Sequence, residues 1–344
     1  MFVQIRGNSS GEQIAKIQNE ARQAGFTEAV VSRGQEIIVI NCIGSVPHER
    51  KVALQEFFRD LPFVIDAVIA TSPFRLTARD AHPENFSVVL NGVSIGAAEP
   101  LVVIAGPCAV ESAEQLVSCA QAVKAAGAKL LRGGAYKPRK SFYNFQGLEE
   151  QGLQLLAQAR QQVGLATVTE VISPELVPLV AQYVDVLQIG TANMGNYALL
   201  RAVGQTNKPV ILKRGMAATV NEWLLAAEYI VATGNHRVIL CARGVRGIEN
   251  GYTRFNADID VIPVVKGLTH HPIIFDPSHP TGDRELVSPV ALAAVAAGAD
   301  GLLVEVHPDP DNALCDGAQS LYPHQFAELM TKVRAVAAAV GRTV

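Results

Sequence analysis

The 344-residue sequence lacks a strong excess of charge of either sign. Its formal net charge is −3 and only 18% of its residues are charged, so it offers no basic face to nucleic acid and no basic run to an acidic membrane surface. No apolar run approaches the roughly 18 residues of a membrane-spanning helix, and the opening MFVQIRGNSS lacks the apolar core of a signal peptide. We therefore expect a cytoplasmic protein that binds no nucleic acid and no membrane, and whose anionic ligands are small.

Paired cysteines are lacking as well. The sequence has five cysteines, an odd number, widely scattered and without a CxxC motif, at positions 42, 108, 119, 241 and 315. This pattern indicates neither a disulfide framework nor a zinc knuckle, so we expect reduced thiols. Cys42 and Cys119 are interpreted as packing residues, and Cys241 lies inside a predicted strand.

What the sequence has is material for a large core, since 49% of its residues are hydrophobic. The length suits a barrel of roughly 250 residues with a smaller companion domain. The first seventy residues predict the order βαββαβ, with strands at 2–6, 28–33, 36–44 and 64–70 and helices at 11–25 and 48–61. That order is typical of a ferredoxin-like domain, which we place at 1–71 and which carries no cluster of titratable residues.

A second domain is predicted at 85–344, after a linker at 72–84 that contains two prolines and many charges. It opens with a β-hairpin around Asn91-Gly92, the favoured type I′ turn. Eight Val/Ile/Leu-rich strands then alternate with helices, and the strands lie at 101–108, 130–135, 166–171, 186–190, 209–215, 237–244, 272–279 and 300–307. Eight such units favour an α/β fold of the (β/α)8 TIM-barrel class, although a doubly wound sheet would show the same alternation.

Polar side chains gather where these strands end, which is the end of a barrel that carries the active site. They are Cys108, Arg132, Lys137, Glu170, Lys213, Arg214, Arg243, Asp276, His279, Glu305 and His307, with Asp316 in the last loop. Each alone has a structural explanation, because a buried cysteine packs as a small hydrophobe and charged groups cap helices or pair with each other. So many together favour a functional site, since charges are rarely tolerated beside buried strands unless they are paired or functional.

Two chemistries are present among them. Arg132, Lys137, Lys213 and Arg243 form a ring of positive charge that suits a ligand with a phosphate and a carboxylate. The other set, Cys108, His279, Glu305 and Asp316, supplies the donor types that bind a divalent transition metal. Such a set accepts manganese, iron, cobalt or zinc, so the sequence predicts one divalent ion without naming it.

Five motifs in order carry a family resemblance: GPCAVES (105–111), LRGGAYKPR (131–139), LKRGM (212–216), DPSHPTG (276–282) and VEVHPDPDNALCDGAQSL (304–321). Together they resemble 3-deoxy-D-arabino-heptulosonate 7-phosphate synthase of the I-beta class, in which a ferredoxin-like domain precedes the barrel. The resemblance covers nearly the whole chain. It implies a transferase that condenses phosphoenolpyruvate with D-erythrose 4-phosphate in the first step of the shikimate pathway.

The resemblance also implies roles for individual residues. Cys108, His279, Glu305 and Asp316 would bind the metal, and the four cations of the ring would hold phosphoenolpyruvate. Pro138, Arg139, Lys140 and Asp276 would hold the aldose phosphate, and the catalytic residues would be Lys137, Lys213 and His279. Two alternatives stay open: a related synthase that takes another aldose phosphate, such as arabinose 5-phosphate, and a catalytically weak barrel that serves in binding or regulation.

Three positions depart from the family pattern. Ala192 stands where the family has an arginine that grips the phosphate of phosphoenolpyruvate, Ala242 where it has a glutamate, and Lys140 where it has a threonine. Either Lys140 supplies the missing charge and the substrate is the ordinary one, or the pocket takes another aldose phosphate. The resemblance further implies a homotetramer and an aromatic amino acid, tyrosine or phenylalanine, as an effector bound by the first domain.

Overall fold

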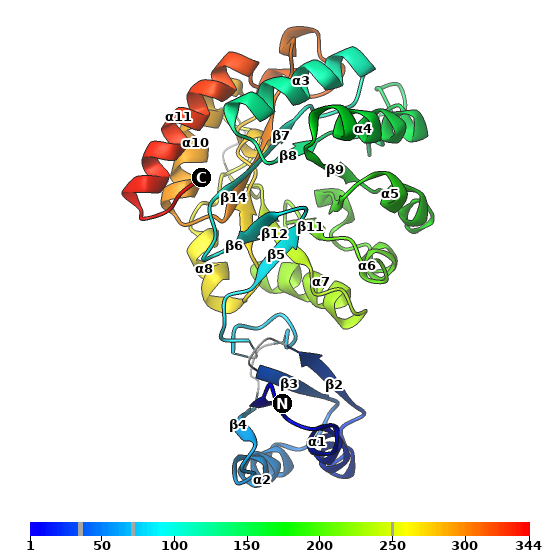
Figure 1. The fold of residues 1–344 in the computed structure, drawn as a ribbon, viewed down its shortest axis with the longest axis vertical. Helices are drawn as coiled ribbons and strands as arrows, with labels where there is room; N and C mark the ends of the chain where they lie inside the picture. Colours follow the sequence, from blue (N-terminus) through cyan, green and yellow to red (C-terminus); the bar gives the residue numbers. More distant parts are fainter. Residues whose placement is uncertain (34–36, 70–72, 81, 140, 249–250) are drawn as a thin grey trace. The chain divides into compact units, whose positions relative to one another are not determined.

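A computed structural model describes residues 1–33, 37–69, 73–80, 82–139, 141–248 and 251–344 (Figure 1). Contacts divide the chain into two compact units. The first comprises Met1–Glu84 with Leu268–His270, and the second comprises Asn85–Gly267 with His271–Val344. Among the described residues no helix is both long and apolar enough to cross a membrane.

The first unit is a four-stranded antiparallel sheet with two helices. In chain order its elements are β1 (Phe2–Arg6), α1 (Gly11–Gln23), β2 (Glu28–Arg33), β3 (Ile37–Ile43), α2 (His48–Arg59) and β4 (Val64–Val68). The strands lie in the order β2-β3-β1-β4, which is the ferredoxin-like arrangement. Helix α1 begins at a capping box in which Ser10 and Gln13 satisfy each other's backbone N–H groups.

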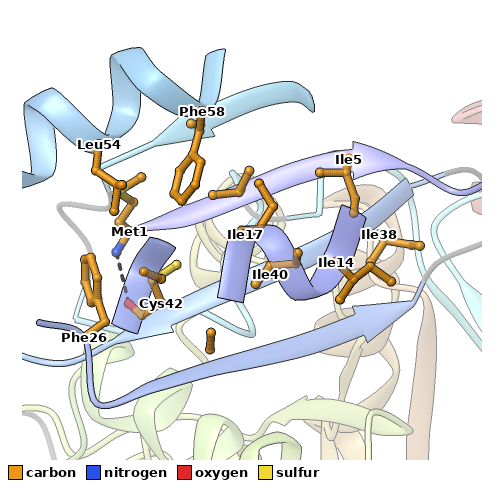
Figure 2. Close-up of a cluster of buried hydrophobic side chains, with 14 of the residues drawn as sticks. Met1, Ile5, Ile14, Ile17, Phe26, Ile38, Ile40, Cys42, Leu54 and Phe58 are labelled. Atoms are coloured by element: carbon orange, nitrogen blue, oxygen red, sulfur yellow. Dashed lines mark hydrogen bonds between the residues drawn. The ribbon is translucent and has the colours of Figure 1, made fainter. Parts of the chain in front are cut away.

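The core of this unit lies between the sheet and its helices. Alternate residues of the strands point to one face, so Ile5, Ile38 and Ile40 pack against Ile14 and Ile17 of α1, as Figure 2 shows. Each fully buried aliphatic side chain of this kind stabilises the fold by roughly 1.5–3 kcal/mol.

The segment 72–84, interpreted above as a linker, belongs to the first unit. Phe74, Leu76 and Thr77 are all at least 97% buried, and the side-chain amide of Gln4 donates to the carbonyl oxygen of Asp80. Its prolines and charges predicted a linker, whereas the structure shows that apolar residues between them are buried.

The second unit is a closed barrel of eight parallel strands, which confirms the predicted fold class. Its strands are β7 (Val102–Gly106), β8 (Leu130–Arg132), β9 (Ala166–Glu170), β10 (Val186–Ile189), β11 (Val210–Lys213), β12 (Val238–Ala242), β13 (Ile273–Phe275) and β14 (Gly301–Glu305). β14 pairs with β7 and closes the ring, which excludes the open doubly wound sheet. The left-handed turn at Asn91 and Gly92 joins β5 (Ser87–Leu90) to β6 (Val93–Gly96), and this hairpin packs on the barrel core.

Helices surround the barrel (Figure 1). They are α3 (Ala113–Ala126), α4 (Glu149–Val163), α5 (Val177–Tyr183), α6 (Tyr197–Gly204), α7 (Val220–Ala232), α8 (Val261–Leu268), α10 (Arg284–Ala296) and α11 (Pro323–Ala339). Short turns fill the loops: η1 (Pro174–Leu176), η2 (Thr191–Asn193), α9 (Ser278–Thr281), η3 (Pro310–Asn312) and η4 (Gly317–Gln319). The helices bury the outer faces of the strands, and Trp223 of α7 is fully buried and donates its indole N–H to the carbonyl oxygen of Leu212.

The strand register explains why polar side chains enter the barrel mouth. Alternate residues of each strand face inward, and the core inside the barrel includes Leu130, Ile211, Cys241, Ile274 and Leu303. Two positions further on, at the carboxyl ends, the same inward register reaches Arg132, Lys213, Arg243, Asp276 and Glu305. These five charged residues are each at least 96% buried.

Candidate functional site

A cavity of about 770 Å³ opens among the loops at the carboxyl end of the barrel. Its lining includes Arg132, Lys137, Pro138, Arg139, Glu170, Gln188, Ala192, Lys213, Arg243, Arg246, Arg254, Phe255, His279 and Asp316. Most of the sequence-predicted site residues therefore lie on one cavity. Cys108, Asp276 and Glu305 lie deeper and contact residues that line it.

Donor atoms that suit a metal ion converge in two groups that share Asp316. One group is His279, Glu305 and Asp316, and the other is Cys108, Cys315 and Asp316, with the donor atoms of each group within 4.8 Å of one another. Asp316 has a left-handed backbone (φ 51°), a costly conformation for a residue other than glycine that is often found at functional sites. Thiol, imidazole and carboxylates around one point are chemically suited to a divalent transition ion.

Glu305, at the end of β14, is fixed by two partners, one at the end of β8 and one in η4. Its Oε1 accepts from Arg132 Nη1 at 2.5 Å, and its Oε2 accepts from the side-chain amide of Gln319 at 2.6 Å. Burial alone would raise the pKa of Glu305, but the charges of His279 and Arg132 outweigh burial and hold this pKa well below its usual range. The carboxylate is therefore ionised at neutral pH and ready to bind a cation.

Lys213, Asp276 and His279 form a buried chain of contacts. Lys213 Nζ lies 2.5 Å from Asp276 Oδ2, and His279 Nδ1 lies 2.6 Å from the same oxygen. Burial works against the ionised form of Asp276, yet His279 and Lys213 together hold its pKa well below its usual range. Burial lowers the pKa of His279, which leaves its Nε2, 3.6 Å from Glu305 Oε1, able to donate an electron pair to a metal ion.

The loop after β8 brings two more cations to the thiols. Lys137 Nζ donates to the carbonyl oxygen of Cys108 at 3.0 Å and lies 3.1 Å from its Sγ. Arg139 Nη1 lies 2.8 Å from Cys315 Sγ, and the two sulfur atoms are 3.0 Å apart. Arg139, which the resemblance assigns to the aldose phosphate, thus contacts the thiol pair in this structure. Lys140, assigned to the same substrate, lies outside the described residues.

Arg243 is a buried cation that has no carboxylate partner among the described residues. It is 3% exposed, its guanidinium stacks on Phe255 at 4.3 Å from the ring centroid, and its Nε and Nη1 have no hydrogen-bond partner among the described residues. Buried donors without partners are costly. Their position on the cavity indicates that an anionic ligand satisfies them.

Sequence reasoning missed several residues of the site. Gln188 follows Val186 in the inward register and lines the cavity, so strand alternation could have found it. Cys315 and Gln319 lie in the irregular loop after β14, where no periodicity signals which side chains turn inward. Arg246 lines the cavity from the loop after β12 and was also overlooked.

The described departures from the family pattern have different surroundings. Ala192 lines the cavity, whereas Ala242 alternates with the inward-facing Cys241 and therefore lies on the helix-facing side of β12. Arg214, placed at the rim by sequence, also follows an inward residue and pairs with Asp258. The change at Ala242 is therefore remote from the ligand, and Ala192 is the departure that alters the cavity wall.

Fold and site together define a class: a (β/α)8-barrel protein with a metal-ligand group and a ring of cations in one cavity at its mouth. The profile of the DAHP synthetase I family matches residues 76–340. Phospho-2-dehydro-3-deoxyheptonate aldolase of Thermotoga maritima is 42% identical over 341 residues, which cover 99% of each chain. The chain belongs to the DAHP synthetase I family, and it is an enzyme of the transferase class.

Solved structures agree with this assignment, and a second group of relatives is similar to the chain at lower identity. The crystal structure of the Thermotoga maritima DAHP synthase superposes with a TM-score of 0.79 at 42% identity and covers 100% of this chain and 98% of that one. A truncated form of the Thermotoga maritima synthase covers 79% of this chain and 99% of its own at 44% identity, with a TM-score of 0.73. The 2-dehydro-3-deoxyphosphooctonate aldolase of Geobacter sulfurreducens is more distant, at 31% identity over 74% of this chain and 98% of that protein.

Proposed function

We propose that the enzyme condenses phosphoenolpyruvate with D-erythrose 4-phosphate and water to give 3-deoxy-D-arabino-heptulosonate 7-phosphate and phosphate. The observation that carries this proposal is the meeting, on one cavity, of the cation ring with the donor group around Asp316. The full-length similarity to the Thermotoga maritima aldolase supports the same reaction, the first step of the shikimate pathway.

The chain's own residues account for the binding of two anionic substrates. Arg132, Lys137, Lys213 and Arg243 reduce the repulsion between two phosphorylated molecules, and they stabilise negative charge that develops during the reaction. Lys213, held by Asp276, is placed to hold the carboxylate of phosphoenolpyruvate or to donate a proton to the aldehyde oxygen as it becomes a hydroxyl. Pro138 and Arg139 line the side of the cavity from which the aldose phosphate would be held.

We propose that one divalent ion is held by Cys108, His279, Glu305 and Asp316. The structure supports this set because the other three donors, Cys108, His279 and Glu305, belong to the two groups that share Asp316. The shifts in the pKa of Glu305 and of His279 also favour the forms that bind metal. Such an ion, when bound, acts as a Lewis acid on the aldehyde oxygen and makes the aldehyde carbon easier to attack. Manganese, iron, cobalt and zinc all suit this donor set.

The choice of aldose is tested by comparing two sugars. We expect the metal-loaded protein to consume phosphoenolpyruvate with D-erythrose 4-phosphate, measured as loss of the enol absorbance, and to show at least about a hundredfold lower kcat/KM with D-arabinose 5-phosphate. Preference for the five-carbon sugar would assign the chain to the second group of relatives. Turnover with neither sugar would favour the binding or regulatory alternative.

The first unit is proposed to act in assembly and regulation, in a cytoplasmic homotetramer that an aromatic amino acid inhibits. The family resemblance supports these points. Light scattering gives the mass of the assembly, and assays with added tyrosine or phenylalanine test the inhibition.

Glu111 is expected to hold the loop that carries Asp316. Its Oε1 accepts from the backbone N–H of Leu314 at 2.9 Å, and its Oε2 lies 3.3 Å from Nε2 of the buried His307. Substitution Glu111→Ala should free this loop and weaken manganese binding by roughly 10- to 100-fold, as loss of groups that orient metal ligands does. Titration of the metal-free protein with manganese measures the change. The matched control is Glu114→Ala on the exposed first turn of α3, and equal affinities of the two variants would contradict this role.

A further inference from the structure

We propose that Arg246, together with Arg243, binds the phosphate group of phosphoenolpyruvate and replaces the arginine that is absent at position 192. This inference rests on the proposed function and adds a binding residue to its site. It starts from the charges that line the cavity and from which of them are already engaged by the protein.

Most of the cations on the cavity have partners within the chain. Arg132 and Lys213 contact the buried carboxylates Glu305 and Asp276, and Arg254 lies 3.7 Å from Asp316. Two further cations, Lys137 and Arg139, lie in the loop after β8 and contact the thiols of Cys108 and Cys315. A cation that already faces an anion or a thiol has less to offer a ligand, so these five do not by themselves explain how a phosphate dianion is held.

Arg243 and Arg246 differ from those five. Nε and Nη1 of Arg243 have no hydrogen-bond partner, and the side chain of Arg246 makes no hydrogen bond or ion pair, within the part of the chain that the structure describes. The two arginines are three residues apart in the loop after β12, and Gly244 between them takes a left-handed turn (φ 82°). One loop thus presents two guanidinium groups to the same cavity.

Backbone contacts place Arg246 on the same side of the mouth as Ala192. The N–H of Arg246 donates to the carbonyl oxygen of Met216 at 2.7 Å, and the N–H of Gly215 lies 3.0 Å from the sulfur of Met194. Met194 follows Ala192 by two residues, so three loops lie side by side. The other lining residues that these three loops contribute are neutral: Gly190, Thr191, Ala192, Met216 and Gly247. The carboxylate of Glu170, at the end of the neighbouring strand β9, lies beside Gly190, so Arg246 also faces one protein anion across this side of the cavity.

This arrangement matches the demands of a phosphate dianion. Guanidinium groups bind phosphate through two parallel N–H···O bonds, and two arginines from one loop can take different oxygens. Arg243 is buried and fixed on Phe255, whereas Arg246 is exposed at the rim. Arg243 shares the buried strand-end register of Arg132 and Lys213, which are proposed to hold phosphoenolpyruvate. We therefore assign the phosphate between Arg243 and Arg246 to phosphoenolpyruvate and place the aldose phosphate toward Arg139.

Calorimetric titration with phosphoenolpyruvate alone tests the inference without turnover. Arg246→Ala should raise the Kd for phosphoenolpyruvate by about tenfold or more, since a charge-assisted hydrogen bond to an exposed group is lost. Arg246→Lys keeps the charge but not the paired N–H groups, so its Kd for phosphoenolpyruvate should lie between that of Arg246→Ala and that of the parent protein. The control is Arg201→Ala, an exposed arginine in the last turn of α6, which should leave the Kd unchanged.

An arginine restored at position 192 tests whether Arg246 occupies the place of the absent arginine. In the double variant Ala192→Arg/Arg246→Ala, an exposed arginine enters from the neighbouring loop, and we expect it to recover most of the lost affinity. In steady-state assays of Arg246→Ala, the KM for phosphoenolpyruvate should rise while the KM for the aldose phosphate changes less than about twofold.

The outcomes separate this inference from the proposed function. An unchanged Kd in Arg246→Ala, a rise in the KM of the aldose instead, or a double variant no better than the single one would overturn the assignment of Arg246. If the parent protein binds phosphoenolpyruvate but turns over neither sugar, the proposed reaction fails, while the affinities still decide the role of Arg246.

Discussion

Substitution Lys213→Met should lower kcat by about 10²- to 10³-fold, the usual effect of removing one preorganised donor from a water-excluded site. The same change leaves Asp276, which is 0% exposed, with His279 as its remaining side-chain contact among the described residues. Removing one partner of a buried ion pair costs about 3 kcal/mol or more, because a buried charge loses its compensation. Steady-state kinetics and denaturant unfolding measure the two effects.

A second variant separates catalysis from stability. Lys213→Met/Asp276→Asn removes both charges of the pair, so we expect it to recover most of the lost unfolding free energy while kcat stays low. If kcat returned together with stability, Lys213 would be a structural residue and its catalytic assignment would be wrong.

Loss of a metal ligand is expected to have the other large effect. Cys108→Ala removes a side chain that is 1% exposed and has three polar contacts, with Lys137, Cys315 and Asp316. The fold should tolerate the small change in volume, but the bound ion should be lost and kcat should fall by at least about a hundredfold. Metal analysis after dialysis and activity assays at saturating substrate give both numbers.

Cys315→Ser is the matched control, since its thiol lies 3.0 Å from that of Cys108 and close to Asp316. We expect this variant to keep one ion per chain. In cobalt-loaded protein, the thiolate-to-cobalt absorption band should disappear in Cys108→Ala and persist in Cys315→Ser. The reverse pattern would make Cys315 the ligand and would revise the proposed set.

The fold could be predicted from sequence because its signals are local. Each barrel strand is a short apolar run bounded by turn residues, and eight runs leave few alternative architectures. The segment 72–84 was interpreted less well, because prolines and charges mark a connection without revealing that Phe74 and Leu76 between them are buried.

The candidate site was predictable where strands end and much less so in loops. Strand alternation carries Arg132, Lys213, Asp276 and Glu305 inward, so their convergence follows from the barrel itself. The partners of these residues depend on tertiary contacts that have no sequence period. The Gln319–Glu305 hydrogen bond therefore emerged only from the structure.

The different surroundings of Ala192 and Ala242 likewise depend on tertiary structure. In the sequence, each of the two is an alanine in place of a charged residue of the family. In the structure, Ala192 lies in η2 and lines the cavity, whereas the register of β12 places Ala242 on the side that faces the helices. Of these two, Ala192 is therefore the one expected to influence substrate binding. Introducing glutamate at 242 should change stability rather than the KM of either substrate.

The central claim is that the barrel mouth performs a metal-assisted condensation of phosphoenolpyruvate with D-erythrose 4-phosphate. The most direct test is to strip the protein with a chelator, add manganese in known increments, and follow phosphoenolpyruvate consumption in the presence of the sugar. We predict no consumption without metal and a linear rise in rate that reaches its plateau at one ion per chain. Full activity in the stripped protein, or none at any manganese concentration or with iron, cobalt or zinc in its place, would contradict the account.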